Sequence, residues 1–300
     1  MSCLHQRGLD RYEAVKPPKE KGSYVLIYRS QIHSRSMRVI RTMRPYSSSW
    51  GSSGASCQVA LRLFCFPYAG GGASIFRTWQ SHLPREVEVC SVDLPGRERR
   101  LVEPRITRMD TLVRLVSAEL APYLNQPFAL FGHSMGALIS FELCRLMRRE
   151  RGTQPVHLFV SGYHAPQLQD PEPSYYDFPE TMFLDRLSRL NGTPKAVLED
   201  PELIGLMLPL LRADFEAVQT YCYSAEPPLN VPITAFGGDQ DLEVPPQGLE
   251  QWRNQTCLGF RAHILPGDHF FLNTARSALL GYLASALEQL VQQMPGRCER

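Results

Sequence analysis

The chain has 300 residues, of which 43% are hydrophobic and 21% are charged, and its formal net charge is +2. This length and composition suit one large α/β domain or two small ones, while so small a net charge gives no argument for nucleic acid as a partner. The longest apolar runs fall far short of the roughly 20 residues that a membrane-spanning helix needs. We therefore expect a protein that binds neither nucleic acid nor a membrane.

Cysteine and histidine usage argues against disulfide and metal chemistry. The eight cysteines are scattered without a Cys-x-x-Cys spacing, and several lie in apolar runs, where a free thiol behaves as a small hydrophobic side chain. The eight histidines are dispersed and form no cluster with metal-ligand spacing. No apolar signal sequence opens the chain. We expect a cytoplasmic monomer without a cofactor or metal.

Residues 1–57 differ in composition from the rest of the chain. Residues 24–57 contain five arginines and no acidic residue, and a Ser/Gly-rich tract covers residues 47–56. Such a composition is typical of an organelle transit peptide, but also of a disordered leader with a flexible linker, or of a chain whose translation begins at Met37 or Met43. We favour the leader and linker, and assign the functional domain to residues 58–295.

A glycine-rich loop follows the first predicted strand. The apolar run over residues 59–66 predicts that strand, which Pro67 ends, and three glycines occupy positions 70–72. Their spacing matches neither G-x-G-x-x-G nor a P-loop with its lysine. The alternatives are a simple flexible turn and a loop whose backbone N–H groups approach a reacting carbonyl. We favour the second, because a nucleophile motif follows later in the chain.

The next segment combines a strand, a basic loop and a helix. Residues 87–92 predict a strand, and residues 109–124 predict an amphipathic helix. Between them, Arg97 and Glu98 suit a structural ion pair, whereas the arginines of the same loop also suit an acidic partner. Spacing alone does not choose between these two interpretations.

The most informative motif is Gly132-x-Ser134-x-Gly136. A short apolar run, residues 128–131, predicts a buried strand before it, and a helical pattern begins at Met135. In this context the motif indicates a nucleophile elbow, a strained strand-to-helix turn that holds the serine hydroxyl at the carboxyl edge of a sheet. Glycines two residues to either side leave room for the backbone to fold back.

After the elbow helix, the alternation of strands and helices is interrupted. Residues 156–160 predict another strand, and the alternation up to this point favours a mostly parallel sheet with helices on both faces. No strand is apparent over residues 164–223, where residues 182–190 and 203–221 predict helices. We expect a helical lid insertion at about 164–225. Its surplus apolar residues suit either an acyl pocket or packing against the body: Leu206, Met207, Leu208, Leu210 and Leu211.

The last two predicted strands, residues 231–236 and 261–265, each end in polar residues. Asp239 and Asp241 follow the first strand and His269 follows the second, and residues 279–291 predict a closing helix. The carboxyl ends of parallel strands meet at one edge of a sheet. The order serine, acid, histidine is that of α/β-hydrolases. Of the other histidines, His133 lies beside the serine with its side chain turned away, and His263 lies inside a strand.

These residues suggest a serine hydrolase mechanism. His269 would take the proton of Ser134, and the carboxylate would orient the imidazole and stabilise its charged form. The N–H groups of Met135 and Ala69 would bind the oxyanion, and water would later release the acyl group. From the residues alone, Asp239 and Asp241 are both candidates for the acid.

From about residue 61 to residue 290 the sequence resembles the type II (external) thioesterases of nonribosomal peptide and polyketide synthesis, relatives of the medium-chain thioesterase that acts with fatty acid synthase. The resemblance rests on separated motifs: Phe66-Pro67-Tyr68-Ala69-Gly70-Gly71, Leu94-Pro95-Gly96-Arg97-Glu98-x-Arg100, Gly132-His133-Ser134-Met135-Gly136, Gly192-Thr193-Pro194, Leu211-Arg212-x-Asp214 and His269-Phe270-Phe271-Leu272. It implies an α/β-hydrolase fold.

The resemblance also implies which residues act. The last residue of the family's Gly-x-x-Asp element falls on Asp241, with Asp239 as the runner-up, and Ala69 and Met135 match the oxyanion donors. Two departures stand out. The segment before Cys57 has no counterpart, and Asn191 occupies a position where the family often has glycine, which we expect to affect the lid and not the triad.

The implied activity is hydrolysis of acyl or aminoacyl thioesters on the phosphopantetheine arm of carrier proteins, which clears stalled or misprimed synthases. The carrier protein domain is the implied partner. A carboxylesterase or lipase acting on small oxygen esters is the alternative, and a non-catalytic α/β-hydrolase that binds an acyl ligand is a third hypothesis.

Overall fold

The computed structural model describes residues 40–42, 59–168, 174–192 and 195–294. Most of the segment predicted to be a leader therefore lies outside the described residues. Within it, strand β1 (Ile40–Thr42) pairs antiparallel with β3 (Val87–Val92), placing Ile40 opposite Val92, and the Ile40 side chain is buried. The prediction of a leader without structure is thus wrong for these three residues, because the free edge of β3 supplies backbone partners that a short segment can use.

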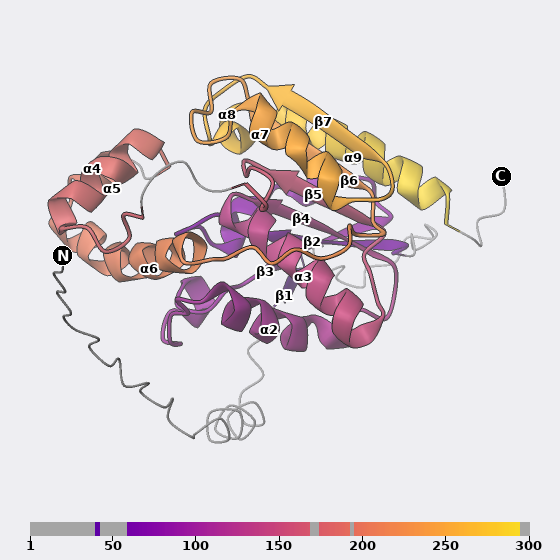
Figure 1. Ribbon diagram of the computed structural model, residues 1–300, viewed down its shortest axis with the longest axis horizontal. Helices are drawn as coiled ribbons and strands as arrows, with labels where there is room; N and C mark the ends of the chain where they lie inside the picture. The colour runs from indigo at the N-terminus through magenta and orange to yellow at the C-terminus, as the bar shows by residue number, and fades with distance from the viewer. Residues whose placement is uncertain (1–39, 43–58, 169–173, 193–194, 295–300) are drawn as a thin grey trace, which may run out of the picture. The chain divides into compact units, whose positions relative to one another are not determined.

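A seven-stranded sheet forms the centre of the described chain, with strand order β1-β3-β2-β4-β5-β6-β7 (Figure 1). All neighbouring pairs from β3 to β7 are parallel. This arrangement confirms the predicted α/β class and brings the carboxyl ends of six strands to one edge. The remaining strands are β2 (Leu61–Phe66), β4 (Phe128–His133), β5 (His157–Ser161), β6 (Ile233–Gly238) and β7 (Phe260–Leu265).

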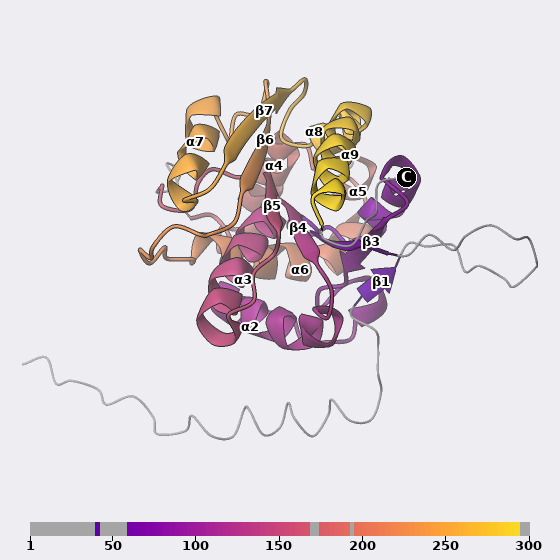
Figure 2. The same ribbon diagram turned by 90° about the vertical axis from the view of Figure 1, so that its right-hand side faces the viewer.

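Helices cover both faces of the sheet. Alternate residues of a strand face opposite sides, so apolar residues of one strand pack against helices on both faces. On β2, Phe64 and Phe66 belong to one apolar cluster together with residues of α2 and α3, whereas Leu61 and Leu63 belong to a second cluster with residues of α9. Figure 2 shows α3 and α7 on one side of the strands and α9 on the other. The helices outside the segment between β5 and β6 include α2 (Met109–Leu120), α3 (Met135–Arg151), α7 (Pro246–Glu250), α8 (Phe271–Thr274) and α9 (Arg276–Gln292).

The described residues between β5 and β6 form three helices, where the sequence predicts a helical insertion. They are α4 (Glu180–Leu190), α5 (Lys195–Leu198) and α6 (Pro201–Gln219), and they lie together at the left of Figure 1. Helix α6 begins at Pro201 because Asp200 caps it, its carboxylate accepting the N–H groups of Glu202 and Leu203 at 2.9 and 3.1 Å. We call residues 164–225 the helical insertion. It has a small apolar cluster of its own that includes Tyr175, Phe183 and Leu187.

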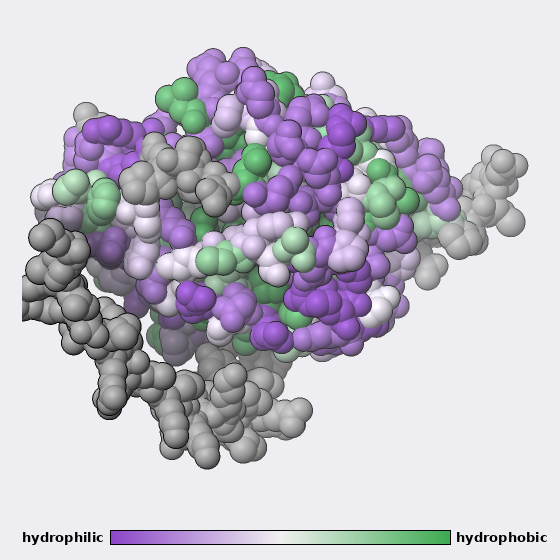
Figure 3. All heavy atoms as spheres, in the orientation of Figure 1, coloured by the Kyte–Doolittle hydropathy of each residue, from purple (hydrophilic) through white to green (hydrophobic). Residues whose placement is uncertain are grey.

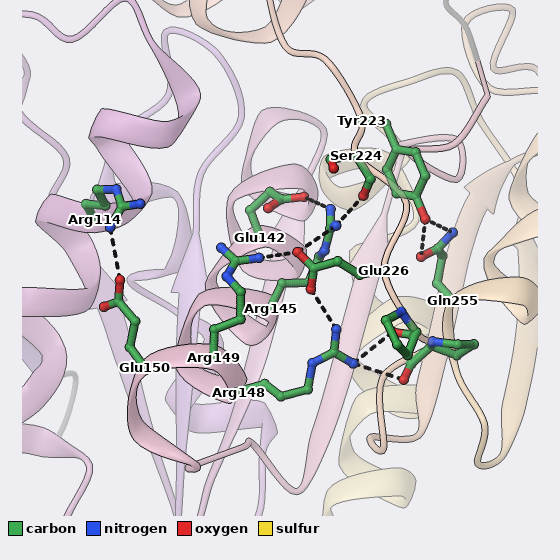
Figure 4. A network of polar contacts seen from close by, with 12 residues as sticks. Arg114, Glu142, Arg145, Arg148, Arg149, Glu150, Tyr223, Ser224, Glu226 and Gln255 are labelled. Atoms are coloured by element: carbon green, nitrogen blue, oxygen red, sulfur yellow. Dashed lines mark hydrogen bonds and ion pairs between the residues drawn. The ribbon is translucent and has the colours of Figure 1, made fainter.

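The segment that leads from α6 back to the sheet is held by the basic half of α3 (Figure 4). Arg148 donates to the Glu226 carboxylate at 2.7 Å and to the carbonyl of Pro227 at 2.8 Å. Arg145 and Arg149 also pair with Glu226. These contacts anchor the carboxyl-terminal root of the insertion to the body.

Where Figure 3 draws described residues, hydrophobic residues are scattered among hydrophilic ones. Among the described residues, no helix combines the length and the apolar character needed to cross a bilayer.

Candidate active site

Ser134 occupies the sharp turn between β4 and α3. Its backbone has φ 54° and ψ −119°, a conformation that a non-glycine residue rarely adopts. The flanking glycines permit it: a Cβ on Gly132 would lie 2.0 Å from the carbonyl oxygen of Gly136, and one on Gly136 would lie 2.2 Å from that of Phe66. The turn is further held by the Ser134 N–H, which donates to the Ser161 carbonyl at 2.7 Å. The local geometry is therefore that of a nucleophile elbow.

Ser134, His269 and Asp241 form one chain of hydrogen bonds. The Nε2 atom of His269 lies 3.0 Å from Ser134 Oγ, and its Nδ1 atom lies 2.9 Å from Asp241 Oδ2. A carboxylate only accepts hydrogen bonds, so Nδ1 carries the proton and Nε2 is left to accept the serine O–H. The other carboxylate oxygen of the buried Asp241 accepts the N–H groups of Glu243 and Val244 at 3.0 and 3.2 Å, which fixes its position.

Asp239, the runner-up acid, has a different environment. It is exposed, and its Oδ1 accepts the Gly267 N–H at 2.8 Å, tying the end of β6 to the loop after β7. The structure thus brings Asp241, and not Asp239, against His269.

His133 packs next to His269 but takes no part in the hydrogen-bond chain of Ser134, His269 and Asp241. Its ring is fully buried, its Nδ1 lies 2.9 Å from Ser161 Oγ, and its centroid is 5.4 Å from that of His269. Burial lowers the pKa of His133 well below its ordinary value, and the neighbouring His269 lowers it further. A neutral ring at this position supports His269 without adding a competing positive charge.

Ala69 and Met135, the two residues suggested as oxyanion donors, lie in the glycine-rich loop and at the start of α3. Met135 is the first residue of α3, where N–H groups lack helical partners and the helix dipole favours negative charge. Ala69 lies in a tight turn that the Gly71 N–H closes onto the Tyr68 carbonyl at 2.9 Å. Gly70, with φ 75°, occupies the turn position that favours glycine.

Arg97 pairs with a residue of the helical insertion rather than with Glu98. Its guanidinium donates to the two carboxylate oxygens of Asp214 on α6, at 2.7 and 2.8 Å. The side chains are only 5% and 2% exposed. Asp214 Oδ2 also accepts the Gly70 N–H at 2.7 Å. The sequence left the role of Arg97 open, and the only earlier sign of Asp214 was its place in the Leu211-Arg212-x-Asp214 motif.

Two cavities meet at the glycine-rich loop, since Tyr68 and Ala69 line both. The smaller, of about 100 Å³, is lined by Ser134 and His269 and also by residues of the insertion such as Phe215. The larger, of about 390 Å³, runs between the loop and α6. Four of the five surplus apolar residues of the insertion line it: Leu206, Met207, Leu210 and Leu211. Leu208 instead packs against the insertion's own cluster.

Comparison with known proteins identifies the family. The sequence model of the thioesterase domain family matches residues 61–288. This chain belongs to the thioesterase family. It is therefore a serine hydrolase that cleaves thioesters, on the α/β-hydrolase fold that the sheet already indicates.

Individual relatives of this thioesterase come from peptide and polyketide biosynthesis. The gramicidin S biosynthesis protein GrsT of Aneurinibacillus migulanus is 49% identical over 227 residues, which cover 76% of this chain and 89% of the relative. The solved structure of the RedJ thioesterase from the prodiginine pathway of Streptomyces coelicolor is 39% identical, with a TM-score of 0.72, covering 81% of this chain and 96% of RedJ. YbtT, a type II thioesterase from the yersiniabactin NRPS/PKS pathway, is 31% identical, with a TM-score of 0.68, covering 86% and 98%.

Asn191, the departure from the family's glycine, reaches further than the insertion itself. It ends α4 with φ 59°, and its amide donates to the Asp268 carboxylate at 2.8 Å. Asp268 immediately precedes His269 and also accepts the Phe270 N–H at 2.9 Å. The side chain therefore connects the insertion to the loop that carries the histidine, a contact that its sequence position did not reveal.

Proposed function

We propose that this thioesterase hydrolyses acyl or aminoacyl thioesters on the phosphopantetheine arm of carrier protein domains, and so regenerates stalled or misprimed nonribosomal peptide or polyketide synthases. The observation that carries the proposal is the continuous hydrogen-bond chain from Ser134 through His269 to Asp241, at 3.0 and 2.9 Å. In this proposal these three residues are the catalytic triad, and the N–H groups of Ala69 and Met135 form the oxyanion hole.

The acylation step follows from this geometry. Ser134 Oγ attacks the thioester carbonyl carbon while His269 Nε2 takes the serine proton. The carbonyl oxygen becomes an oxyanion that accepts the two backbone N–H groups. The C–S bond then breaks, the acyl group stays on Ser134, and the proton on His269 passes to the departing sulfur. A thiol has a pKa near 8.5, so its sulfur needs less protonation to leave than an alkoxide oxygen does.

Deacylation repeats the same steps with water as the nucleophile. Water loses a proton to His269 as it attacks the acyl carbon, and Ser134 Oγ regains that proton as it leaves. Asp241, with both oxygens hydrogen-bonded, holds the imidazole in position through both steps and stabilises its transient positive charge.

The choice of a carrier-bound substrate is supported by the relatives and by the shape of the site. GrsT acts in gramicidin S biosynthesis, and YbtT belongs to an NRPS/PKS pathway. The larger cavity, between the glycine-rich loop and α6, adjoins the catalytic one along Tyr68 and Ala69 and offers a route for a long, flexible arm. In this proposal the helical insertion is the lid over that route.

The test is thiol release from an acyl group on a phosphopantetheinylated carrier domain, with a matched oxygen ester of the same acyl group as the competitor. We expect the thioester to be preferred, and Ser134→Ala to lose at least about a thousandfold in kcat. A fluorophosphonate should label the wild type and not the variant. Preference for the oxygen ester would favour a carboxylesterase, and absence of labelling would favour a non-catalytic acyl-binding protein.

A further inference from the structure

Among the described residues, the most deeply buried ion pair between the insertion and the body lies beside the proposed oxyanion hole. The carboxylate of Asp214, on α6, accepts hydrogen bonds from a side chain and from a backbone N–H group of the body. Its two oxygens accept the Arg97 guanidinium, and its Oδ2 also accepts the Gly70 N–H at 2.7 Å. Arg97 donates in addition to the Gly71 carbonyl at 3.1 Å. The pair therefore holds the glycine-rich loop through both an N–H group and a carbonyl oxygen.

These contacts constrain the turn that carries Ala69. The turn runs from Tyr68 to Gly71, and the Gly70 N–H belongs to its central peptide group. In a β-turn that group has two orientations, which differ by a flip that reverses the direction of its N–H. Only one orientation directs the Gly70 N–H at Asp214. The carboxylate thus selects one form of the turn and ties the turn to α6. The Ala69 N–H belongs to the preceding peptide group, so its place in the site depends on where the turn as a whole is held.

Packing on the same side reinforces this selection. A Cβ on Gly70 would lie 2.5 Å from Leu211 Cδ2, so the α6 side chain rests directly on the turn. Burying two charges is costly, and an apolar pair of similar volume is often as stable or more so. The directional hydrogen bonds, rather than added stability, distinguish this ion pair from apolar packing.

We propose that Asp214 is a positioning residue for the oxyanion hole. Through the Gly70 N–H and Arg97, it couples the seating of α6 on the body to the position of the turn, and so to the position of the Ala69 N–H that the turn carries. This inference rests on the proposed function, which assigns Ala69 as an oxyanion donor. It predicts that the hole is fully formed only while α6 is seated.

The test compares Asp214→Ala and Asp214→Asn with wild type. Losing one oxyanion donor costs about 100- to 1,000-fold in kcat. A donor that is displaced but still present should cost less, so we expect Asp214→Ala to lower kcat by about 10- to 100-fold, with KM on a small acyl thioester changed less than about twofold. Asp214→Asn keeps an oxygen that can accept the Gly70 N–H, so it should recover most of the kcat that Asp214→Ala loses.

Glu88→Gln is the matched control. It also removes a carboxylate from a partly buried arginine pair, with Arg62 at 3.1 Å, but at the amino ends of β2 and β3, away from the site. It should leave kcat unchanged. Thermal unfolding of all variants separates a loss of stability from a loss of positioning. Equal losses of kcat in Glu88→Gln and Asp214→Ala, or an Asp214→Ala protein with lower Tm but wild-type kcat, would overturn the proposal.

A second readout keeps the inference separate from the choice of substrate. The phosphoryl oxygen of a fluorophosphonate occupies the oxyanion site as Ser134 attacks phosphorus, so its labelling rate reports the hole without any thioester. We expect this rate to fall in parallel with kcat in Asp214→Ala. If wild type is labelled but does not hydrolyse carrier thioesters, the proposed substrate is wrong, while unchanged labelling of Asp214→Ala would refute the positioning role alone.

Discussion

The sheet and the helical insertion differ in the share of apolar and polar contacts that hold them in place. In the body, two apolar clusters fill the spaces on either side of the sheet. The insertion has its own smaller cluster. Apolar contacts near the end of α6, such as that of the buried Ala217, and several polar pairs join it to the body. These pairs become more exposed from α6 towards α4: Arg97 and Asp214 are 5% and 2% exposed, whereas Arg186 and Glu243 are 18% and 31% exposed. Asn191 and Asp268, at the end of α4, form an exposed pair.

Because of this difference, we expect contacts in the body to determine mainly the free energy of unfolding, and polar contacts of the insertion to determine mainly the geometry of the site. Apolar burial has no preferred direction and contributes in proportion to the area removed from water. Hydrogen bonds and ion pairs contribute little net stability, but they require particular orientations. Substitutions in the body should therefore change the free energy of unfolding, and substitutions at the contacts of α6 should change kinetic constants. The contacts of α4 should matter least.

The largest effect is expected in the body. Leu283 of α9 is fully buried against the sheet, so Leu283→Ala should lower the free energy of unfolding by about 2–5 kcal/mol through lost burial and the cavity that remains. Urea denaturation measures this loss. Activity of the variant below its unfolding transition should stay at the wild-type level. A strongly reduced kcat in a fully folded Leu283→Ala protein would contradict the expectation that substitutions in the body change stability and not catalysis.

The body should also carry acid-dependent stability through His157 of β5. Burial, with a smaller effect from Arg261, lowers the pKa of His157 to about 4. The unfolded chain, with a histidine pKa near 6.5, takes up the proton first. The contribution of the neutral His157 to the free energy of unfolding is thus fully present above pH 6.5 and is lost as the pH falls from 6.5 towards 4. We expect a loss on the order of 2 kcal/mol by pH 5 from this residue.

Urea denaturation at pH 7.5 and pH 5 checks this, with His157→Gln as the variant. The variant should lose less stability than wild type between the two pH values. Some acid dependence should remain, because the buried His133 has a lowered pKa for the same reason. An unchanged pH dependence in His157→Gln would contradict the assignment.

At the contact of α6, Gly70→Ala should act mainly on catalysis. The residue has φ 75°, which costs a side-chain-bearing residue roughly 1–2 kcal/mol, and the new methyl would meet Leu211 Cδ2. We expect a fall in kcat of about tenfold or more as the turn and α6 separate. Gly205→Ala is the control on the same helix, since its Cβ would point into open space. It should keep kcat and raise Tm slightly.

The smallest effect is expected at the end of α4. Glycine adopts φ 59° freely, and the hydrogen bond from Asn191 to Asp268 is exposed, so Asn191→Gly should change kcat by less than about twofold. Steady-state kinetics on a small acyl thioester measures this. A loss of tenfold or more would mean that α4 positions the His269 loop as strongly as α6 positions the glycine-rich loop. It would contradict the expectation that contacts of α6 affect catalysis more than contacts of α4.

Much of the fold could be predicted because its signals are local. The run at residues 87–92 matches β3 residue for residue, and the elbow helix begins at the predicted Met135. Apolar runs bounded by Pro and Gly report strands whatever the rest of the chain does. Strand β1 escaped prediction because its three residues carry too little pattern, and only pairing with β3 makes them a strand.

The sequence by itself determined the elbow, because the strain at Ser134 and the close approach of its glycines are properties of five consecutive residues. It also indicated which residues follow the later strands, and hence that Asp241 and His269 are candidates. Only the tertiary structure decided which acid touches the histidine, since two carboxylates two residues apart differ in orientation and not in pattern. The same holds for Arg97 and Asp214, whose pairing across 117 positions depends on where α6 comes to rest.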